Sequence, residues 1–412
     1  MLLLHTADLH LGKTIRDRDI LEDQARALDA MLDAVTRERP AALLVAGDVF
    51  DRSIPPPEAV GLFDSFLCRA VAASPGMVVV IVPGNHDSAA RLSFGASLLR
   101  LAGVHLRTRA EDCVEPVLVE RDGERAAIWA LPFLGPGAFA PRGDASSARA
   151  GAEAPASSAP ELPFDEPEGA REARPAPASQ AELFERAMGM IGGRLLPDSR
   201  NVLLAHCFAA GGAASESERA FVGASEQVDA SLADRFDYAA YGHLHRFQPA
   251  GSRGRYSGSP LAYSFAEGEE DKGFVLVELG SGGARTELVR ITPLRPMRRI
   301  EGPFAELSAP GARPECREAF VEARLTDPEP VLNPADPLRA NFPNLLAVRQ
   351  AAFELAAGRA PAAEAAPDAG QGPAAVAADF AAFHERMRGE PPDAASAALF
   401  NRLLEEAGHE AL

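Results

Sequence analysis

Three apolar runs in the first hundred residues alternate with amphipathic segments, and this alternation limits the fold more than any other sequence feature. The runs expected to form strands are residues 2–7, 41–46 and 77–82. The segments expected to form helices are residues 19–37, 55–73 and 88–101. The last run is rich in β-branched residues, as expected for a strand buried on both faces. The order β-α-β-α-β-α predicts an α/β fold with a largely parallel first sheet.

Shorter elements follow these six segments along the chain. Residues 114–120 and 126–131 flank an Asp122-Gly123 turn and are expected to form a hairpin. Residues 135–179 are rich in Ala, Pro, Ser, Gly and Glu, which predicts a mostly disordered surface insertion, with an ordered lid as the alternative. Later elements are expected as a helix over residues 180–195 and strands over residues 201–205, 238–241 and 274–279.

The character of the sequence changes near residue 293, and a division into three domains follows. Residues 1–290 are expected to form a large domain, residues 291–350 a small α/β domain, and residues 351–412 a linker with C-terminal helices. The Ala/Pro/Gly-rich linker and the two tail helices are placed at residues 358–374, 375–388 and 394–406. These helices either dock a partner or pack on their own domain.

Short polar motifs stand where the expected strands end. Ligands of open α/β sheets lie outside the carboxyl ends of the strands, so these side chains are expected to converge in one crevice. The glycines of the motifs permit tight turns and close approach of the backbone. The motifs are Asp8-Leu9-His10, Gly47-Asp48-Val49-Phe50-Asp51, Gly84-Asn85-His86-Asp87, Ala205-His206 and Gly242-His243-Leu244-His245.

The residue types in these motifs favour a pair of divalent cations. Carboxylate oxygens, imidazole nitrogens and an amide oxygen suit manganese, iron or zinc, and Asp48 is able to bridge two ions with its two oxygens. A single Asp-x-His or His-x-His is a weak signal, and Gly-Asn-His-Asp is also typical of an ordinary turn. All five motifs in this order are strong evidence. His5 and His105 fall outside the motifs and are interpreted as structural.

Composition limits the class of protein and raises one difficulty. Hydrophobic residues make up 47% of the 412 residues, enough for a large core, and the longest apolar runs are too short to cross a bilayer. A cytoplasmic protein without a signal peptide is expected. The four cysteines form no C-x-x-C pair, so no disulfide framework is expected. The formal net charge of −18 argues against strong DNA binding by this chain alone.

The order of the motifs resembles the calcineurin-like metallophosphoesterase superfamily. Within it, the chain resembles the SbcD-type nucleases of bacteria over residues 5–12, 46–51, 242–246 and 256–265. The likeness covers about the first 290 residues apart from residues 135–179, and it is fainter afterwards, around Asn341-Phe342-Pro343-Asn344. The resemblance implies a four-layer α-β-β-α sandwich with a small α/β capping domain and a C-terminal helical tail.

The resemblance also implies a role for each motif residue. One metal ion takes Asp8, His10, Asp48 and His245, and a second takes Asp48, Asn85, His206 and His243. His86 matches the family's catalytic histidine, which is not a ligand. Asp51 matches the acidic position that orients this histidine in phosphatase relatives, whereas some nuclease relatives have a histidine there. Two divalent cations are implied, with Mn²⁺ as the first choice.

The function implied by the resemblance is that of a metal-dependent DNA nuclease subunit in DNA repair, recombination and replication. It would act as an exonuclease on double strands and as an endonuclease on hairpins and single strands. Its implied partners are an SbcC-type coiled-coil ATPase, which holds DNA, and a second copy of the chain within a heterotetramer. Arginines on neighbouring loops are further candidates for DNA contact, although most surface arginines are simply solvated: Arg16, Arg18, Arg52 and Arg91.

Two other functions compete with this interpretation. The first is a phosphodiesterase or phosphatase for small molecules or phosphoproteins, which needs the same metal pair. The second is a binding scaffold without catalysis, and the complete set of ligand positions with His86 argues against it.

Overall fold

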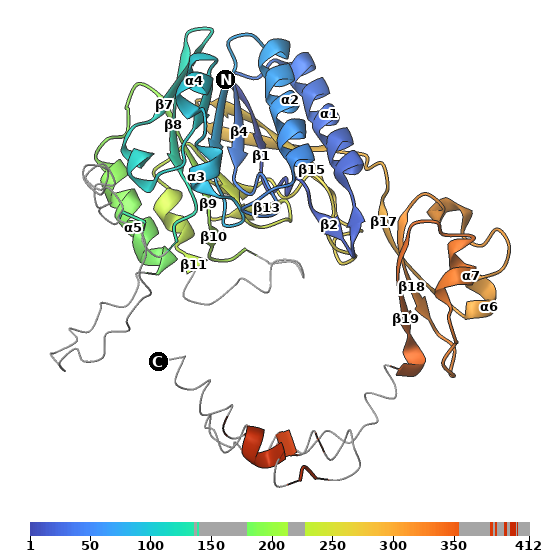
Figure 1. Ribbon diagram of the computed structural model, residues 1–412. Coiled ribbons are helices and arrows are strands. Elements are labelled where there is room, and N and C mark those ends of the chain that lie inside the picture. Colours follow the sequence, from blue (N-terminus) through green and yellow to red (C-terminus); the bar gives the residue numbers. More distant parts are fainter. Residues whose placement is uncertain are drawn as a thin grey trace, which may run out of the picture. The chain divides into compact units, whose positions relative to one another are not determined.

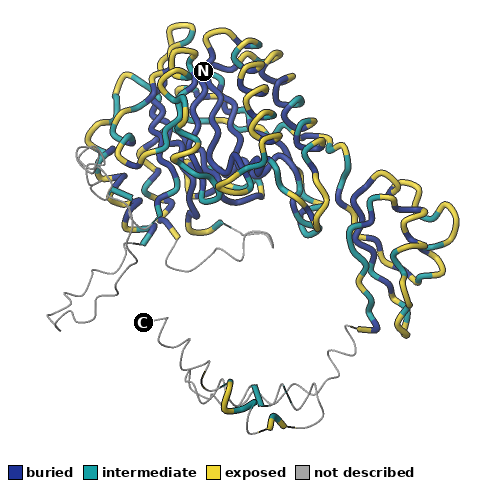
Figure 2. Tube along the Cα trace, viewed as in Figure 1, coloured by how far each residue is buried: buried dark blue, intermediate teal, exposed yellow. Residues whose placement is uncertain are grey.

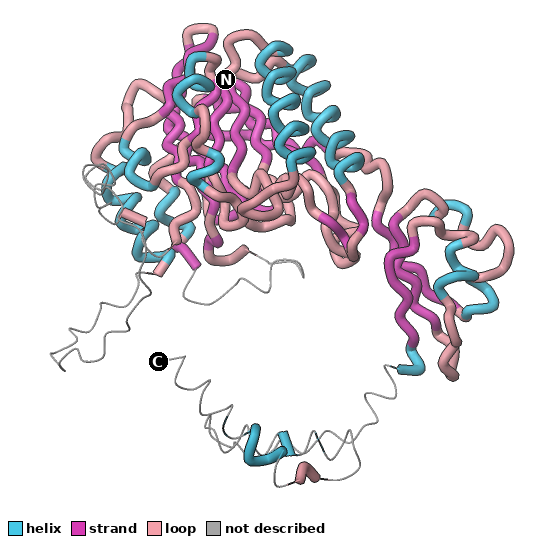
Figure 3. Tube along the Cα trace, in the orientation of Figure 1, coloured by secondary structure: helices cyan, strands magenta, loops and turns pink. Residues whose placement is uncertain are grey.

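The computed structural model describes residues 1–135, 138–139, 179–212 and 227–353, together with residues 380–381, 384, 391–393, 396–400 and 402 of the tail. Two six-stranded sheets form its centre, and helices cover their outer faces (Figure 1). The mixture of helices and strands is drawn by type in Figure 3.

The first sheet has the strand order β16-β15-β1-β4-β5-β6. Strands β1, β4, β5 and β6 run parallel to one another, and β15 pairs antiparallel with both β1 and β16. The predicted parallel start of the fold is therefore confirmed. The strands are β1 (Leu2–Thr6), β4 (Ala42–Ala46), β5 (Val78–Val82), β6 (Val104–Leu106), β15 (Gly273–Gly280) and β16 (Gly283–Arg290).

The second sheet has the strand order β13-β14-β12-β9-β8-β7. Its central strands β8, β9, β12 and β14 are parallel, and β7 and β13 pair antiparallel at the two edges. The predicted hairpin is confirmed as β7 and β8. The strands are β7 (Val117–Arg121), β8 (Glu124–Leu131), β9 (Arg200–His206), β12 (Tyr238–Gly242), β13 (Gln248–Ala250) and β14 (Gly254–Tyr256).

Apolar side chains from both sheets meet in a common core between them. Leu3, Leu44 and Val80 come from the first sheet, and Ile128 and Leu204 come from the second. All five are fully buried, and Figure 2 shows the central strands in the buried colour. Because each sheet is covered on both faces, its inner strands consist of nearly continuous runs of apolar residues.

Helices close the sandwich on each outer face. Helices α1 (Leu21–Glu38) and α2 (Pro57–Ala73) pack on the first sheet, and α5 (Gln180–Gly192) packs on the second. Helix α5 begins with a capping box, in which Ser179 and Glu182 satisfy each other's backbone N–H groups. These layers confirm the expected four-layer α-β-β-α sandwich.

Two local expectations differ from the structure. The helix expected over residues 88–101 is two short helices, α3 (Ala89–Leu92) and α4 (Ala96–Leu101), because Gly95 between them adopts a left-handed conformation. Strand β16 was not predicted from the sequence. It is an edge strand with mostly polar, part-exposed side chains, so it lacks the apolar run that marks the buried strands.

The remaining described elements are short. Strands β17, β18 and β19 form a three-stranded sheet in that order, and two further pairs are β2-β3 and β10-β11. These elements are β2 (Thr14–Ile15), β3 (Arg18–Asp19), β10 (Phe208–Ala209), β11 (Gln227–Val228), β17 (Met297–Gly302), β18 (Phe320–Leu325), β19 (Leu345–Gln350), α6 (Phe304–Leu307) and α7 (Ala335–Arg339). Single-turn 3₁₀ segments are Ala110–Val114, Ala230–Ala233 and Pro314–Cys316.

Contacts within the chain define two compact units, and the predicted domain boundaries near residues 290 and 350 stay predictions. The first unit is Met1–Glu301, Ala305–Arg324 and Asn333–Val348, and the second is Gly302–Phe304, Leu325–Leu332 and Arg349–Leu412. The predicted insertion at residues 135–179, the linker at residues 358–374 and most of the two tail helices lie outside the described residues. Within the described residues, none of the helices combines the length and the apolar character that crossing a bilayer requires.

Candidate metal centre

The carboxyl ends of five strands bring the motif side chains together. Asp8 and His10 follow β1, Asp48 follows β4 and Asn85 follows β5, three parallel neighbours in the first sheet. His206 ends β9, and His243 and His245 follow its parallel neighbour β12 in the second sheet. Parallel neighbours end at the same edge of a sheet, so each sheet presents its motif residues on one side.

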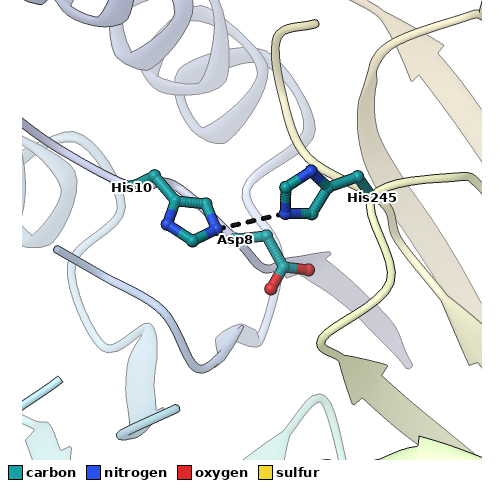
Figure 4. A group of neighbouring side chains, drawn as sticks. All are labelled: Asp8, His10 and His245. Carbon is teal, nitrogen blue, oxygen red and sulfur yellow. Dashed lines mark hydrogen bonds between the residues drawn. The ribbon is translucent and has the colours of Figure 1, made fainter. Parts of the chain in front are cut away.

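Asp8, His10 and His245 form a first ligand group. Their potential ligand atoms all lie within 4.8 Å of one another, and Nε2 of His10 is 3.1 Å from Nε2 of His245. Figure 4 shows the facing ring nitrogens of His10 and His245, with the Asp8 side chain beside them. All three are buried. Two imidazoles and a carboxylate in this arrangement are suitable ligands for a divalent cation.

Asn85, His206 and His243 form a second ligand group. Oδ1 of Asn85 lies 3.0 Å from Nε2 of His206 and 3.1 Å from Nδ1 of His243. Oδ2 of Asp48 stands between the two groups, 3.7 Å from Nε2 of His10 and 3.5 Å from Nε2 of His206. All seven residues predicted as ligands therefore lie in one cluster.

The protonation of His206 indicates that a cation fits this cluster. Nδ1 of His206 lies 2.8 Å from the backbone oxygen of Ala46, which only accepts, so the proton of the neutral ring is on Nδ1. The lone pair on Nε2 then faces the carboxylate of Asp48 and the amide oxygen of Asn85. Lone pairs that face one another at these distances repel, and a cation between them turns the repulsion into coordination.

Burial lowers the pKa values of the histidines, whereas the histidines beside Asp48 lower the pKa of that carboxylate against the effect of burial. Desolvation lowers the pKa of His10 to about 4 and that of His243 to about 3, and it also lowers the pKa of His206. Burial by itself raises the pKa of Asp48, but the neighbouring His206 and His10 outweigh it and lower that pKa to about 2. Neutral imidazole and ionised carboxylate are the forms that bind metal ions.

Four of the seven predicted ligands have strained backbone conformations. The φ angles are +53° for Asp8, +43° for His10, +49° for Asp48 and +108° for His243. Side chains with a Cβ rarely adopt this region, and each such residue costs about 1–3 kcal/mol. Because these residues are concentrated at the strand ends, we infer that the positions of their side chains are maintained at the cost of backbone strain.

Two polar residues to which the sequence analysis gave no role hold the ligand loops. The carboxylate of Asp87 accepts backbone N–H groups from Val49, Phe50 and Gly84, which ties the loop after β4 to the loop after β5. Gln24 on α1 donates to the backbone oxygen of His10 at 2.7 Å. The signal for Gln24 was present in the sequence, because it interrupts the apolar stripe of an amphipathic helix.

His86 and Asp51 lie at the edge of the cluster. The His86 ring packs edge to face against the His10 ring, with centroids 4.8 Å apart. A ring nitrogen of His86 also lies within 4.8 Å of potential metal-ligand atoms of His10 and Asp48. Nδ1 of His86 is 2.8 Å from the backbone oxygen of Asp51. The Asp51 carboxylate forms a salt bridge with Lys13 at 2.6 Å. The expected side-chain contact from Asp51 to His86 is thus replaced by a backbone contact, which any residue at position 51 would supply.

Two buried charges behind His245 were also missed by sequence reasoning. Oε1 of Glu267 is 3.7 Å from Nδ1 of His245, and Oε2 of Glu267 is 2.8 Å from Nζ of Lys272. Burial raises the pKa of Glu267, but the contacts with His245 and Lys272 outweigh it and hold that pKa far below its usual range. Nothing in the local sequence marks these residues, since both lie more than twenty residues from His245.

The histidines interpreted as structural lie outside the ligand groups. Nδ1 of His5 is 2.9 Å from the hydroxyl of Tyr238, across the interface between the two sheets. His105 is part of β6 at the edge of the first sheet.

The model of the calcineurin-like phosphoesterase family matches residues 1–247, more than half of the chain and all of the ligand positions. The chain belongs to the calcineurin-like phosphoesterase family. A phosphoesterase of this family that carries such a cluster uses divalent metal ions as its cofactors. A second model, described as the type 5 capsule protein repressor C-terminal domain, matches residues 293–384.

Among curated proteins, the phosphoesterase is similar to two staphylococcal chains named as the SbcD subunit of the SbcCD nuclease. The protein of Staphylococcus saprophyticus is 27% identical over 357 residues, which cover 86% of each chain. The protein of Staphylococcus epidermidis is 27% identical over 361 residues, again 86% of each chain. A solved structure, TT1561 of Thermus thermophilus, covers 70% of this chain and 99% of its own at 15% identity, but its TM-score of 0.36 is too low to bear on the fold.

Replacing Gly84 by alanine is expected to disrupt metal binding. A Cβ at this position would lie 2.1 Å from Oδ1 of Asp48 and 2.5 Å from its backbone nitrogen, so Asp48 must move. Because metal–ligand distances tolerate only about 0.2 Å, we expect Gly84→Ala to weaken metal binding at least about tenfold in a calorimetric titration. The control is Gly61→Ala on α2, where nothing lies within 4 Å of the added methyl group. Equal metal affinity in the two variants would contradict the placement of Asp48 in the centre.

Proposed function

We propose that this phosphoesterase is the metal-dependent nuclease subunit of an SbcC–SbcD type complex, and that it hydrolyses DNA phosphodiester bonds in repair and recombination. The observation that carries the proposal is the cluster of seven candidate ligand side chains, with the Asp48 carboxylate between the two groups. DNA as the substrate is supported by the names of the two staphylococcal relatives, whose likeness extends over 86% of the chain. The family model that matches residues 293–384 carries the label of an SbcD C-terminal domain, which supports the assignment as an SbcD-type subunit.

The proposed cofactors are two Mn²⁺ ions, held by Asp8, His10, Asp48 and His245 and by Asp48, Asn85, His206 and His243. The mixed oxygen and nitrogen donor set suits manganese as it does iron or zinc, and the resemblance to the SbcD-type nucleases makes Mn²⁺ the first choice. When bound, two such cations stabilise the charge of a scissile phosphate and make water available as a nucleophile near neutral pH.

His86 is proposed as the residue that moves the proton. The backbone oxygen of Asp51 is only an acceptor, so Nδ1 of His86 carries a proton and Nε2 is left to face the substrate. A protonated Nε2 at this place donates to the leaving sugar oxygen, or stabilises the charge that develops on the phosphate. The backbone N–H of His86 meanwhile holds Oδ1 of Asp48 at 2.9 Å, so the same segment also positions a ligand.

A second copy of the chain is proposed as a partner, alongside a coiled-coil ATPase that holds the DNA. Such an ATPase would explain how a chain with a net charge of −18 acts on a polyanion. Support for the second copy comes from three large apolar side chains on and beside α4. Phe94, Leu98 and Leu101 are 89%, 73% and 85% exposed. An apolar surface of this kind is typical of an interface between protein chains.

The substrate is tested by digestion of DNA. With Mn²⁺ and the partner ATPase, the full-length chain is expected to degrade linear duplexes and to open hairpins, whereas chelation of the metal stops both reactions. Product lengths on a sequencing gel measure the activity. Rapid hydrolysis of small phosphomonoesters without any cleavage of DNA would reject the nuclease and favour the phosphatase alternative.

Replacing His86 by alanine separates proton transfer from metal binding. We expect His86→Ala to retain two bound ions and to reduce turnover by about 10²–10⁴-fold, the range of a lost general acid. Metal content by mass spectrometry and initial rates on a duplex measure the two effects. Loss of bound metal in the variant would instead make His86 a ligand, an arrangement that its position near His10 and Asp48 allows.

Charged substitutions on α4 test the second copy. The double variant Leu98→Glu and Leu101→Glu is expected to sediment as a monomer while the unmodified chain sediments as a dimer. Leu118→Glu on β7, an exposed leucine at 48%, is the matched control and is expected to remain dimeric. A dimer of unchanged stability in the double variant would exclude α4 as the interface.

A further inference from the structure

The two histidines of the first ligand group have the same kind of support behind them. Oδ1 of Asp51 lies 3.5 Å from Nδ1 of His10, and Oε1 of Glu267 lies 3.7 Å from Nδ1 of His245. In both rings the Nε2 atom is the one directed into the first ligand group, where the two Nε2 atoms are 3.1 Å apart. Each ring thus has its ligand nitrogen on one side and a carboxylate on the other.

Each of these carboxylates is in turn held by a lysine. Nζ of Lys13 lies 2.6 Å from Oδ1 of Asp51, and Nζ of Lys272 lies 2.8 Å from Oε2 of Glu267. Lys13 and Lys272 are the only two lysines among the 412 residues of the sequence. The other residues counted among Lys and Arg are all arginines. Both lysine side chains, which carry compact ammonium groups, therefore lie behind the same ligand group.

The Glu267–Lys272 pair is buried and fully connected. Glu267 is completely inaccessible, and it also accepts hydrogen bonds from Oγ of Ser264 at 2.9 Å and the backbone N–H of Tyr263 at 3.3 Å. Nζ of Lys272 donates to the backbone oxygen of His245 at 2.7 Å. A buried carboxylate is costly unless its charge is compensated, and the lysine both compensates it and ties it to the backbone of the ligand.

The second ligand group is supported in a different way. Nδ1 of His206, the nitrogen behind its ligand atom, faces the neutral backbone oxygen of Ala46. His243 presents its Nδ1 to the co-ligand Asn85, so that contact belongs to the ligand group itself. A carboxylate at the distal nitrogen of a ligand histidine fixes the tautomer and makes the ring a stronger ligand, and a neutral carbonyl does so less. The two metal positions are therefore expected to differ in affinity.

We propose that Asp51 with Lys13, and Glu267 with Lys272, are positioning pairs that orient His10 and His245 and make the first ligand group the tighter of the two metal sites. The proposal rests on the proposed function, because it takes these histidines as metal ligands. It also gives the Asp51 side chain a task toward His10 instead of His86. The pairs act through the histidines and do not touch the substrate.

The experiment compares isosteric substitutions in the full-length protein by titration with Mn²⁺, followed by calorimetry and by the electron paramagnetic resonance signal of free Mn²⁺. Glu267→Gln and Asp51→Asn remove a charge with little change of shape. Each is expected to weaken one of two binding events by about 10–100-fold and to leave the other unchanged. The same substitutions in a His206→Ala background are expected to weaken the one strong event that remains.

Glu270→Gln is the matched control, because Glu270 also contacts Nζ of Lys272, at 3.3 Å, and pairs with the exposed Arg246. It is expected to leave both binding events unchanged. If Glu267→Gln does not yield folded protein, Asp51→Asn tests the proposal at His10, where the carboxylate is partly exposed.

Unchanged affinities in the Glu267 and Asp51 variants, or equal losses at both sites, would overturn the positioning pairs. So would a loss in Glu270→Gln as large as that in Glu267→Gln. Failure of the unmodified chain to bind two ions would instead reject the proposed function itself, so the two failures are distinguishable.

Discussion

The structure depends on the face-to-face packing of two six-stranded sheets through one apolar core. Because Leu3, Leu44, Ile128 and Leu204 lock the sheets together, the carboxyl ends of β1, β4 and β5 lie beside those of β9 and β12. Residues up to 235 positions apart, such as Asp8 and His243, come into hydrogen-bond contact there. Neither sheet alone carries a complete ligand set. The centre therefore forms only when the apolar core holds the two sheets together.

The centre itself is locally unfavourable, and the surrounding structure offsets this. Four ligands hold left-handed backbone, and acceptor atoms of Asp48, Asn85 and His206 face one another in a buried space. The Asp87 carboxylate, Gln24 and the backbone oxygen of Ala46 keep these groups in place. Strain and concentrated negative charge of this kind are consistent with a site built for cations, which relieve the repulsion on binding.

Much of this arrangement follows from local sequence patterns. The apolar runs of β1, β4, β5, β9 and β12, and the polar motifs after them, predicted both the α/β fold and the seven clustered residues. The interruption of helix 88–101 at Gly95 and the polar edge strand β16 were missed, because conformation at a glycine and pairing at an edge depend on neighbours more than on periodicity. The alternatives of phosphatase and nuclease share one ligand set, so the cluster supports phosphoester chemistry and the flanking resemblance supports DNA.

The sequence by itself determined which chemical groups stand at the strand ends, because strand period and turn residues are encoded within about ten positions. Only the tertiary structure decided what stands behind those groups. It placed the Asp51 backbone at His86 and the Asp51 carboxylate beside Lys13 and His10, and it brought Glu267 and Lys272 to His245. Such contacts depend on how the loops fold over the sheet edge. They join side chains from segments that are distant in the sequence, so local sequence patterns do not predict them.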